Sequence, residues 1–495
     1  MFSLGLDIGS SSVKAALTET HSGKKIAFVQ EPKDEMEMIS VQSSWAEQNP
    51  NQWWKIVCIA IKKLLQNSGV DASQIQRIGI AYQMHGLVVV DESGECLRNS
   101  IIWCDSRAVS IGEKAYQDLG AKKCMDHLLN SPANFTASKL KWVKESEPHI
   151  YEKIHKFMLP GDYIAYKFSG EMTTTINGLS EGTIWDFKSQ EVAQWLFDYY
   201  NIDSSMTPTI VPNFVTQCVV NKKGAEDSGL KEGTPITYRA GDQPNNAFSL
   251  HVINPGEVAA TGGTSGVVYA LTDNLQSKEH QRINHFAHIN YSKESPVIGK
   301  LLCINGAGIQ YRWMKNNTCA NSYEEMNQLA EKRDVGSDGL LVYPFGNGAE
   351  RMLNNQNINA RYLNLNLNQH DLGSMYRATL EGIAFSFVYG IKFIEDDNFD
   401  LASIKAGNDN LFQSAVFSQT IATLVGKEIQ LYNTTGAIGA ARASSTNVED
   451  LDAFVKMSTK NDYFKSFTPE KDPSRYEIAF SNWVNELEKM INLQN

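Results

Sequence analysis

Two short stretches, half a chain apart, share one pattern, and this pattern constrains the fold more than any other feature of the sequence. Residues 5–17 read GLDIGSSSVKAAL and residues 257–271 read EVAATGGTSGVVYAL. Each consists of an apolar run, a turn rich in glycine and hydroxyl side chains, and a second apolar run. The pattern predicts a strand, a tight turn and another strand. A repeat of this kind predicts two similar lobes that face each other.

The segments around the first repeat predict a mixed α/β protein. Apolar runs and turns alternate over residues 2–31, which is typical of an antiparallel meander. Apolar residues at helical spacing fill 50–68, after Pro50 and before Gly69, and predict an amphipathic helix. Further strands are expected at 75–82 and 86–91. Turn residues gather at 240–256, so we expect two domains, 1–245 and 246–495.

Composition excludes several classes of partner. A formal net charge of -11 repels nucleic acid, and no stripe of basic residues offsets it. Apolar runs such as IVCIAI at 56–61 are far shorter than the roughly 20 residues that span a bilayer, and the N-terminus has no basic leader region. The seven cysteines are never spaced as CxxC, which favours reduced thiols. We therefore expect a cytoplasmic protein that binds neither nucleic acid nor membrane.

The two turns suggest a nucleotide site. Backbone N–H groups in a tight turn form a concave site for phosphate oxygens. Asp7 precedes the first turn, and a carboxylate beside phosphate requires a Mg²⁺ ion between them. The pattern thus predicts ATP and Mg²⁺, while a plain hairpin with a solvated turn is the alternative. The predicted phosphate-binding residues are Gly9, Ser10, Ser11, Ser12 and Lys14 in the first stretch and Gly262, Gly263, Thr264 and Ser265 in the second.

Asp242 is the strongest candidate for a catalytic group. It lies in AGDQPNNAF, after a glycine and just upstream of the second turn. In phosphoryl transfer to a hydroxyl, an aspartate accepts the hydroxyl proton and orients the nucleophile. The alternative is a carboxylate that only caps a loop.

Two loops have the composition of a polyol site. Met84, His85 and Gly86 follow the strand predicted at 75–82, and such a loop at a strand end can hold a small polyol. Asp105 and Arg107 follow another apolar run, at 101–103. The alternatives are a structural histidine and a surface ion pair between Asp105 and Arg107. In the second half, INGAGIQ and IKAGNDN place small residues before helical segments, as expected where backbone passes a flat ligand such as adenine.

Taken in order, these motifs resemble the FGGY family of carbohydrate kinases, of the actin and hexokinase superfamily, along nearly the whole chain. The matching segments are GLDIGSSSVKAAL, QMHGLVVVDESGECL, IIWCDSRA, AGDQPNNA, ATGGTSGVV and AGNDNLFQSAVFSQTIATLVGKEI. The resemblance implies two ribonuclease-H-like lobes around a central cleft, with ATP mainly on the C-terminal lobe and the sugar on the N-terminal lobe. It also implies a homodimer, because family members are often dimers.

The resemblance assigns roles to single positions. Asp242 matches the general base and, with Asp7, the carboxylates near Mg²⁺. Met84 and His85 match the sugar-contacting pair of the members that phosphorylate xylulose, with Gly86 and Asp105 on the same side. The nucleotide-binding positions it adds to the two turns are Gly308, Ala406, Gly407, Asn408 and Asn410.

The implied reaction is ATP-dependent phosphorylation of D-xylulose to D-xylulose 5-phosphate. Departures from the family pattern leave the sugar open: Gln243 and Pro244 follow Asp242, and GAERMLNN at 348–355 replaces a stretch that usually reads GERTP. Kinases of another ketose or polyol, such as ribulose, fuculose, sedoheptulose or glycerol, remain alternatives. So does a non-catalytic, actin-like nucleotide switch.

Overall fold

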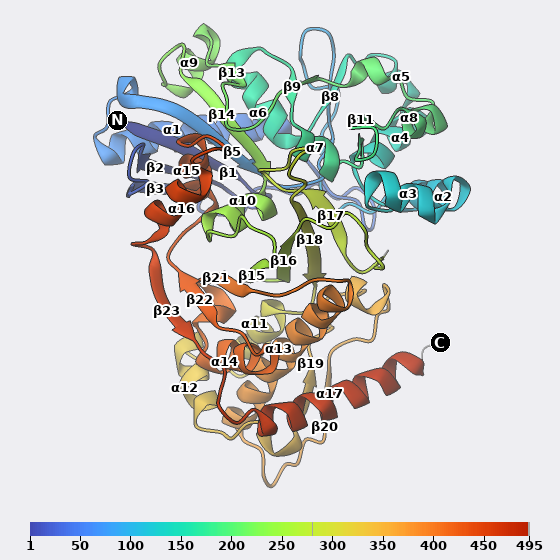
Figure 1. Ribbon diagram of the computed structural model, residues 1–495, viewed down its shortest axis with the longest axis vertical. Helices are drawn as coiled ribbons and strands as arrows, with labels where there is room; N and C mark the ends of the chain where they lie inside the picture. Colours follow the sequence, from blue (N-terminus) through green and yellow to red (C-terminus); the bar gives the residue numbers. More distant parts are fainter. Residues whose placement is uncertain (280, 494–495) are drawn as a thin grey trace.

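The computed structural model describes residues 1–279 and 281–493, and it contains one large sheet in each half of the chain (Figure 1). The N-terminal sheet has the order β13-β14-β5-β1-β2-β3. Its strands are β13 (Cys218–Val219), β14 (Pro235–Gly241), β5 (Ile75–Tyr82), β1 (Phe2–Ile8), β2 (Val13–Glu19) and β3 (Lys25–Glu31). The C-terminal sheet has the order β17-β18-β16-β15-β21-β22-β23. Its strands are β17 (Asn284–Ala287), β18 (Ile298–Ile304), β16 (Gly266–Thr272), β15 (Glu257–Gly262), β21 (Ser403–Gly407), β22 (Ile429–Tyr432) and β23 (Tyr463–Phe467).

The two sheets repeat one topology. In the first, β1, β2 and β3 form an antiparallel meander, and β5 and then β14 add in parallel beyond β1. In the second, β15, β16 and β18 form the antiparallel part, and β21 and then β22 add in parallel beyond β15. Both predicted phosphate turns therefore join the first two strands of a sheet. The prediction of two similar lobes in an α/β protein is confirmed.

Helices and short strands complete the two halves. The helices are α1 (Pro50–Ser68), α2 (Val109–Leu119), α3 (Ala121–Leu128), α4 (Thr136–Ser146), α5 (Pro148–Tyr151), α6 (Pro160–Ser169), α7 (Ile176–Glu181), α8 (Gln194–Tyr200), α9 (Lys222–Ser228), α10 (Asp242–Ser249), α11 (Gly308–Asn317), α12 (Tyr323–Glu331), α13 (Leu372–Asp396), α14 (Ala415–Val425), α15 (Gly436–Ser444), α16 (Leu451–Thr459) and α17 (Ser474–Asn492). The short strands are β4 (Glu47–Gln48), β6 (Val88–Val90), β7 (Ser100–Ile101), β8 (Lys156–Met158), β9 (Thr173–Thr174), β10 (Trp185–Asp186), β11 (Glu191–Val192), β12 (Thr209–Ile210), β19 (Leu341–Tyr343) and β20 (Arg361–Leu363).

Helix α1 forms where the sequence predicts it. The Asn49 side chain accepts a hydrogen bond from the Asn51 N–H, and Pro50 occupies the first turn, where its missing N–H costs nothing. Gly69 ends the helix with a φ of 66°, a left-handed conformation that glycine adopts without strain. The apolar face of the helix, which includes the fully buried Val57, packs on β2 and β3.

Helix α15 belongs to the C-terminal half of the chain but packs on the N-terminal sheet (Figure 1). Two glycines make this contact. A Cβ atom on Gly5 of β1 would lie 1.9 Å from the Ala437 carbonyl oxygen, and one on Gly79 of β5 would lie 2.0 Å from the Ala440 carbonyl oxygen. The helix backbone thus rests directly on the strands, and no larger residue fits between them.

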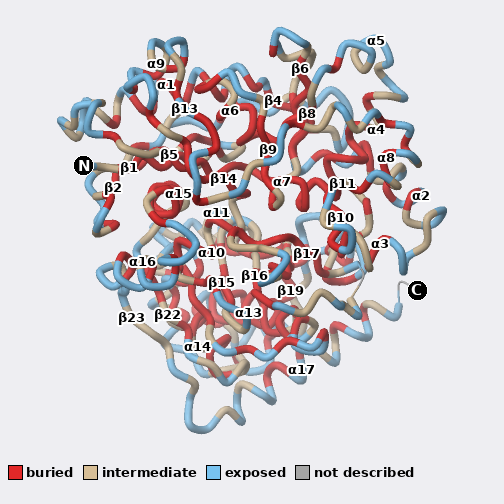
Figure 2. The backbone as a smooth tube through the Cα atoms, turned by 45° about the horizontal axis from the view of Figure 1, so that its top comes forward, coloured by how far each residue is buried: buried red, intermediate tan, exposed pale blue. Residues whose placement is uncertain are grey.

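Each large sheet has its own apolar core. Figure 2 shows that the central strands of both sheets are buried. One core contains β1 and β5 together with the inner face of α1, and the other contains β15, β16 and α13. Helix α10 leads from the end of β14 toward the second sheet, where the Asn246 amide donates to the Thr261 hydroxyl over 3.1 Å. Among the described helices, none is long and apolar enough to cross a membrane.

We expect Gly79→Ala to destabilise the protein by about 1–3 kcal/mol, because the added methyl group displaces the α15 backbone from β5. Urea unfolding followed by circular dichroism measures the change. An unfolding midpoint equal to that of the wild type would contradict the close contact between α15 and this strand.

Candidate active site

Three neighbouring parallel strands end at the same edge of the N-terminal sheet and bring the predicted catalytic residues together. Ile8 of β1 pairs with Tyr82 of β5, and Tyr82 pairs on its other side with Gly241 of β14. Asp7 lies at the end of β1, and Asp242 directly follows β14 as the first residue of α10. The Met84–Gly86 loop leaves the end of β5 between them. The carboxyl ends of parallel strands are the usual place for ligand-binding loops in α/β proteins.

The two aspartates influence each other. Burial raises the pKa of Asp242 to about 7, and the negative charge of Asp7 adds to this effect. The Lys14 ammonium lies 3.6 Å from the Asp7 carboxylate and is a partly exposed counter-charge. Two carboxylates that repel each other at one strand edge are the oxygen ligands that Mg²⁺ prefers, so these residues fit a divalent cation.

The first phosphate turn is closed by the Gly9 N–H, which donates to the Ser12 carbonyl over 3.0 Å. The Ser10 carbonyl accepts from the Gln48 amide over 2.7 Å, and the Ser11 carbonyl accepts from the Met36 N–H over 2.8 Å. The protein thus satisfies the carbonyl groups of the turn. Within the described part of the chain, the N–H groups of Ser10 and Ser11 have no hydrogen-bond acceptor, which is the arrangement that phosphate oxygens require.

His85 has a fixed tautomer. Its Nδ1 lies 2.9 Å from the Glu181 carbonyl oxygen, which can only accept, so Nδ1 carries the hydrogen. Burial lowers the pKa of His85 to about 3, and the ring is neutral at physiological pH. Nε2 is therefore a hydrogen-bond acceptor. Phe135 and Phe286 flank the ring at centroid distances of 4.8 and 5.1 Å.

The neighbours of His85 are tightly packed. Met84 is buried against Gly241, where a Cβ atom would lie 2.5 Å from the methionine Cγ. A Cβ atom on Gly86 would lie 2.5 Å from the Pro160 ring. Both positions of the loop therefore shape the strand edge through packing.

The second phosphate turn is built in the same way at the edge of the C-terminal sheet. β15 and β21 are parallel, with Ala260 opposite Ala406, so the Gly262–Ser265 turn and Gly407 emerge at one edge. The Gly308 N–H donates to the Gly263 carbonyl over 3.0 Å, which joins α11 to the turn. The structure thus brings together these predicted nucleotide-binding segments.

The remaining predicted nucleotide-binding residues differ in which of their groups are available to contact a nucleotide. The Ala406 side chain is fully buried in the C-terminal core, and only its backbone is available. The Asn408 amide donates to Asn433 over 3.0 Å, and the Asn410 amide donates to Asp409 over 3.1 Å. Contact of these residues with a nucleotide stays a prediction.

Asp105 pairs with Arg107, but the alternative of a surface ion pair is wrong, because Asp105 is fully buried and Arg107 nearly so. The Arg107 guanidinium stacks against Trp45 at 3.9 Å and Trp142 at 4.7 Å, and these rings exclude water from the pair. The Asp105 carboxylate also accepts from the Ala46 N–H over 2.6 Å. Protein donors thus occupy it, and its contact with a sugar stays a prediction.

Sequence reasoning missed two buried carboxylates. Glu181 ends α7, and its Oε2 would lie 2.7 Å from a Cβ atom on Gly241; burial holds its pKa well above the usual range. Glu350 accepts from the N–H groups of Asn305 and Gly306 over 3.0 and 2.7 Å and so supports the turn before α11. The GAER stretch signals Glu350 through the family resemblance, whereas no local signal marks Glu181.

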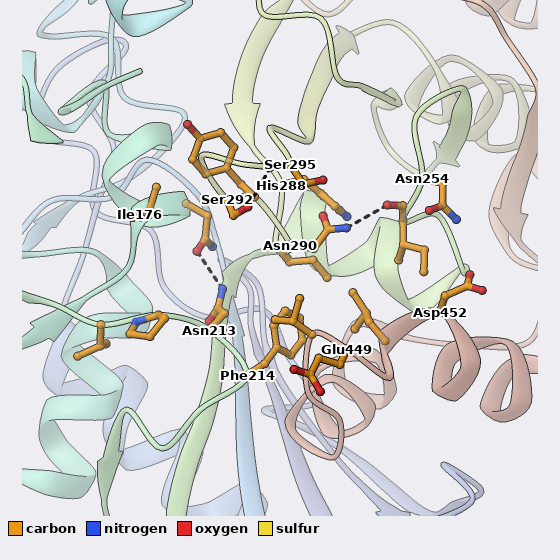
Figure 3. A pocket seen from close by; sticks show the side chains of 18 residues that line it. Ile176, Asn213, Phe214, Asn254, His288, Asn290, Ser292, Ser295, Glu449 and Asp452 are labelled. Atoms are coloured by element: carbon orange, nitrogen blue, oxygen red, sulfur yellow. Dashed lines mark hydrogen bonds between the residues drawn. The ribbon is translucent and has the colours of Figure 1, made fainter. Parts of the chain in front are cut away.

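A separate cavity of about 400 Å³ lies away from these strand ends (Figure 3). Residues from both halves line it, including Asn177, Asn213, Asn290, Glu449 and Asp452. None of the predicted site residues is among its described lining residues, and neither is any lysine or arginine. It therefore does not suit phosphate, and the strand edges remain the candidate active site.

Comparison with known proteins finds matching family models in both halves of the chain. The family model described as the FGGY family of carbohydrate kinases, N-terminal domain, matches residues 2–249, and the C-terminal domain model matches residues 258–447. A xylulose kinase of Bacillus subtilis (strain 168) is 27% identical over 401 residues, 79% of this chain and 77% of the relative. A xylulose kinase of Haemophilus influenzae is 25% identical over 98% of this chain and 99% of the relative.

Solved structures share the fold. The xylulose kinase of Rhodospirillum rubrum superposes with a TM-score of 0.87 at 21% identity, covering 100% of this chain and 99% of that chain. The glycerol kinase of Plasmodium falciparum with ADP also gives 0.87, at 17% identity, covering 99% of this chain and 98% of that chain. Since the two family models together span most of the sequence, this chain belongs to the FGGY family of carbohydrate kinases.

Proposed function

We propose that this kinase transfers the γ-phosphoryl group of ATP to D-xylulose and releases ADP and D-xylulose 5-phosphate. The observation that carries the proposal is the convergence of Asp7, His85 and Asp242 at the ends of three paired parallel strands. Curated relatives named xylulose kinase, from Bacillus subtilis and Haemophilus influenzae among others, support the choice of sugar.

Asp242 is the proposed general base. In its ionised form it accepts the proton of the attacking sugar hydroxyl while the oxygen forms a bond to the γ-phosphorus. The bond between the γ-phosphorus and the bridging oxygen breaks, and ADP leaves with the bridging oxygen. A bound Mg²⁺ would neutralise phosphate charge there, and Asp7 and Asp242 are the residues proposed to hold it.

His85 is proposed to bind a hydroxyl group of the sugar. Its Nδ1 is committed to the Glu181 carbonyl, so the free Nε2 accepts a hydrogen bond from the substrate. The two turns are proposed to hold the phosphates of ATP through backbone N–H groups, because each turn joins the first two strands of its sheet.

The fold does not select the sugar, because similar structures include a gluconate kinase of Lactobacillus acidophilus and the glycerol kinase already described. We expect ADP release with ATP and Mg²⁺ to be stimulated most by D-xylulose in a panel that also contains L-xylulose, D- and L-ribulose, sedoheptulose, L-fuculose and glycerol. Stronger stimulation by another sugar would keep the kinase and reject the proposed substrate.

Replacing Asp242 by asparagine removes the base and keeps the shape of the side chain. We expect turnover to fall by roughly 10²- to 10⁴-fold, the usual scale for loss of a general base. ATP affinity, measured by calorimetry without sugar or Mg²⁺, is expected to stay within about threefold of the wild type, because the phosphate turns are untouched. Turnover equal to that of the wild type would remove Asp242 from the mechanism.

The raised pKa of Asp242 has a consequence for stability. Its folded-state pKa of about 7 lies above the ordinary 3.8, so between these values the folded protein binds more protons than the unfolded chain. The wild type therefore loses stability relative to Asp242→Asn as pH rises from about 4 to about 7. Urea titrations at pH 5, 6, 7 and 8, without nucleotide or metal, measure this difference.

The same titrations test the metal site without measuring activity. We expect added Mg²⁺ to stabilise the wild type more than Asp242→Asn at pH 8, because the variant lacks one of the two charged ligands. In the titrations without metal, a stability difference between the wild type and Asp242→Asn that does not change with pH would show that Asp242 titrates normally.

A further inference from the structure

The first predicted sugar loop ends where the second begins. The Met84–Gly86 loop leads into β6, and the Ile102–Asp105 loop follows β7. The Leu87 N–H donates to the Ile101 carbonyl over 3.0 Å, so a backbone bridge joins the points where the loops meet the strands. The bridge joins the end of the first loop to the start of the second, while the Gln83 N–H, before the first loop, donates to the Ile8 carbonyl over 2.8 Å.

Residues 134–139, which lie outside both loops, donate hydrogen bonds to carbonyl groups of both; they are called the 134–139 segment below. The Lys139 Nζ donates to the His85 carbonyl over 2.8 Å and to the Ile102 carbonyl over 3.0 Å. The Asn134 amide donates to the Asp105 carbonyl, and the Thr136 hydroxyl makes a long contact of 3.4 Å to the Gly86 carbonyl. Carbonyl groups from both loops therefore converge on the start of α4.

A lysine is unusual at this position because the position is fully buried. Its side chain is fully buried, and among the described residues no carboxylate lies within 4 Å of its ammonium group. Burial lowers the pKa of Lys139 to about 7, and the negative charge of Asp105 offsets part of this effect. Burying an amine without a directly paired charge is costly, and its hydrogen-bond partners among the described residues are the two loop carbonyls, while the Asp105 carboxylate acts on it from beyond 4 Å.

The hydrogen bond from Lys139 to the His85 carbonyl stabilises an uncommon backbone conformation. His85 has a φ of 63°, in the left-handed region that few non-glycine residues adopt. Its ring is fixed by the Glu181 carbonyl and by Phe135, which itself belongs to the 134–139 segment. Lys139 anchors the backbone of the same residue, so ring and backbone are fixed from two directions.

The hydrogen bond from Lys139 to the Ile102 carbonyl fixes the start of the second loop. Ile102 precedes Trp103, a tryptophan that is 50% exposed. An exposed aromatic ring at the start of a loop that follows the sugar-side strands is suited to contact a polyol. One ammonium group thus ties the residue with the proposed acceptor, His85, to the residue that carries this ring into the loop.

We propose that Lys139 is a positioning residue that sets the affinity for the sugar by holding the His85 and Ile102 carbonyls together. It does not touch the substrate; it acts through the His85 imidazole and the Trp103 ring. The proposal rests on the proposed function, because it assigns the sugar site to these two loops.

The test compares Lys139→Met with a matched control, Lys300→Met. Lys300 is also fully buried, and its ammonium also makes two hydrogen bonds, to the carbonyl and the carboxylate of Asp397, each over 2.7 Å. It lies in β18 of the C-terminal sheet, outside both sugar loops. Both variants lose a buried ammonium, and only one of them frees the loops.

For Lys139→Met we expect the KM for D-xylulose to rise by about tenfold or more, the scale of losing a buried charge-assisted hydrogen bond. The KM for ATP is expected to stay within about threefold of the wild type, since the phosphate turns are intact. Lys300→Met is expected to unfold at lower urea concentration while its two KM values stay near those of the wild type. If D-xylulose is not the preferred sugar, the same comparison uses the sugar that stimulates the wild type most.

Four outcomes would overturn the proposal. A sugar KM for Lys139→Met equal to that of Lys300→Met removes the positioning role, and an equal rise in both KM values shows a general structural defect. If Lys139→Met does not fold, Lys139→Gln keeps a polar donor but shortens the side chain, so it cannot hold both carbonyls, and it is expected to raise the sugar KM by about threefold; no rise rejects the proposal. A wild type that no sugar stimulates would instead reject the proposed function itself, together with the role built on it.

Discussion

The parallel pairing of β14, β5 and β1 places Asp7, His85 and Asp242, the three residues on which the proposed function rests. Asp7, the Met84–Gly86 loop and Asp242 lie at one edge of the sheet because the three strands end in register. A shift by one residue would turn Asp7 to the opposite face of the sheet. The many apolar residues of β1 and β5 that lie in the core hold this register, so packing far from the site fixes its geometry.

The return of the chain to the N-terminal sheet adds a second constraint. Gly436, the first residue of α15, lies against the Asp7 carboxylate, where a Cβ atom would be 2.6 Å from Oδ2. The Gly436 carbonyl also accepts from the Asn245 amide of α10 over 2.9 Å. The Asp7 strand, the Asp242 helix and the last third of the chain thus meet at one point. The packing of α15 on Gly5 and Gly79 sets this junction, so it supports the site as well as the fold.

Local patterns in the sequence predicted what local interactions determine. The meander, helix α1 and the two hydroxyl-rich turns depend on neighbouring residues, and the structure contains them at the predicted positions. The hold of Lys139 on His85 joins residues 54 apart, and no periodicity reveals such a contact. The pairing of Asp105 with Arg107 was visible at a spacing of two, but its burial depends on Trp45 and Trp142, which are distant in sequence.

The electrostatics of Asp242 connect the two roles proposed for it. A general base must be ionised to accept a proton, yet burial and the charge of Asp7 favour the protonated form near neutral pH. A positive charge placed between the two carboxylates offsets both effects and lowers the pKa of Asp242. The proposed metal ligands and the proposed base are therefore one electrostatic unit. In such a unit a cation bound with the nucleotide would raise the ionised fraction of the base near neutral pH, which would link the competence of the base to the binding of the phosphoryl donor.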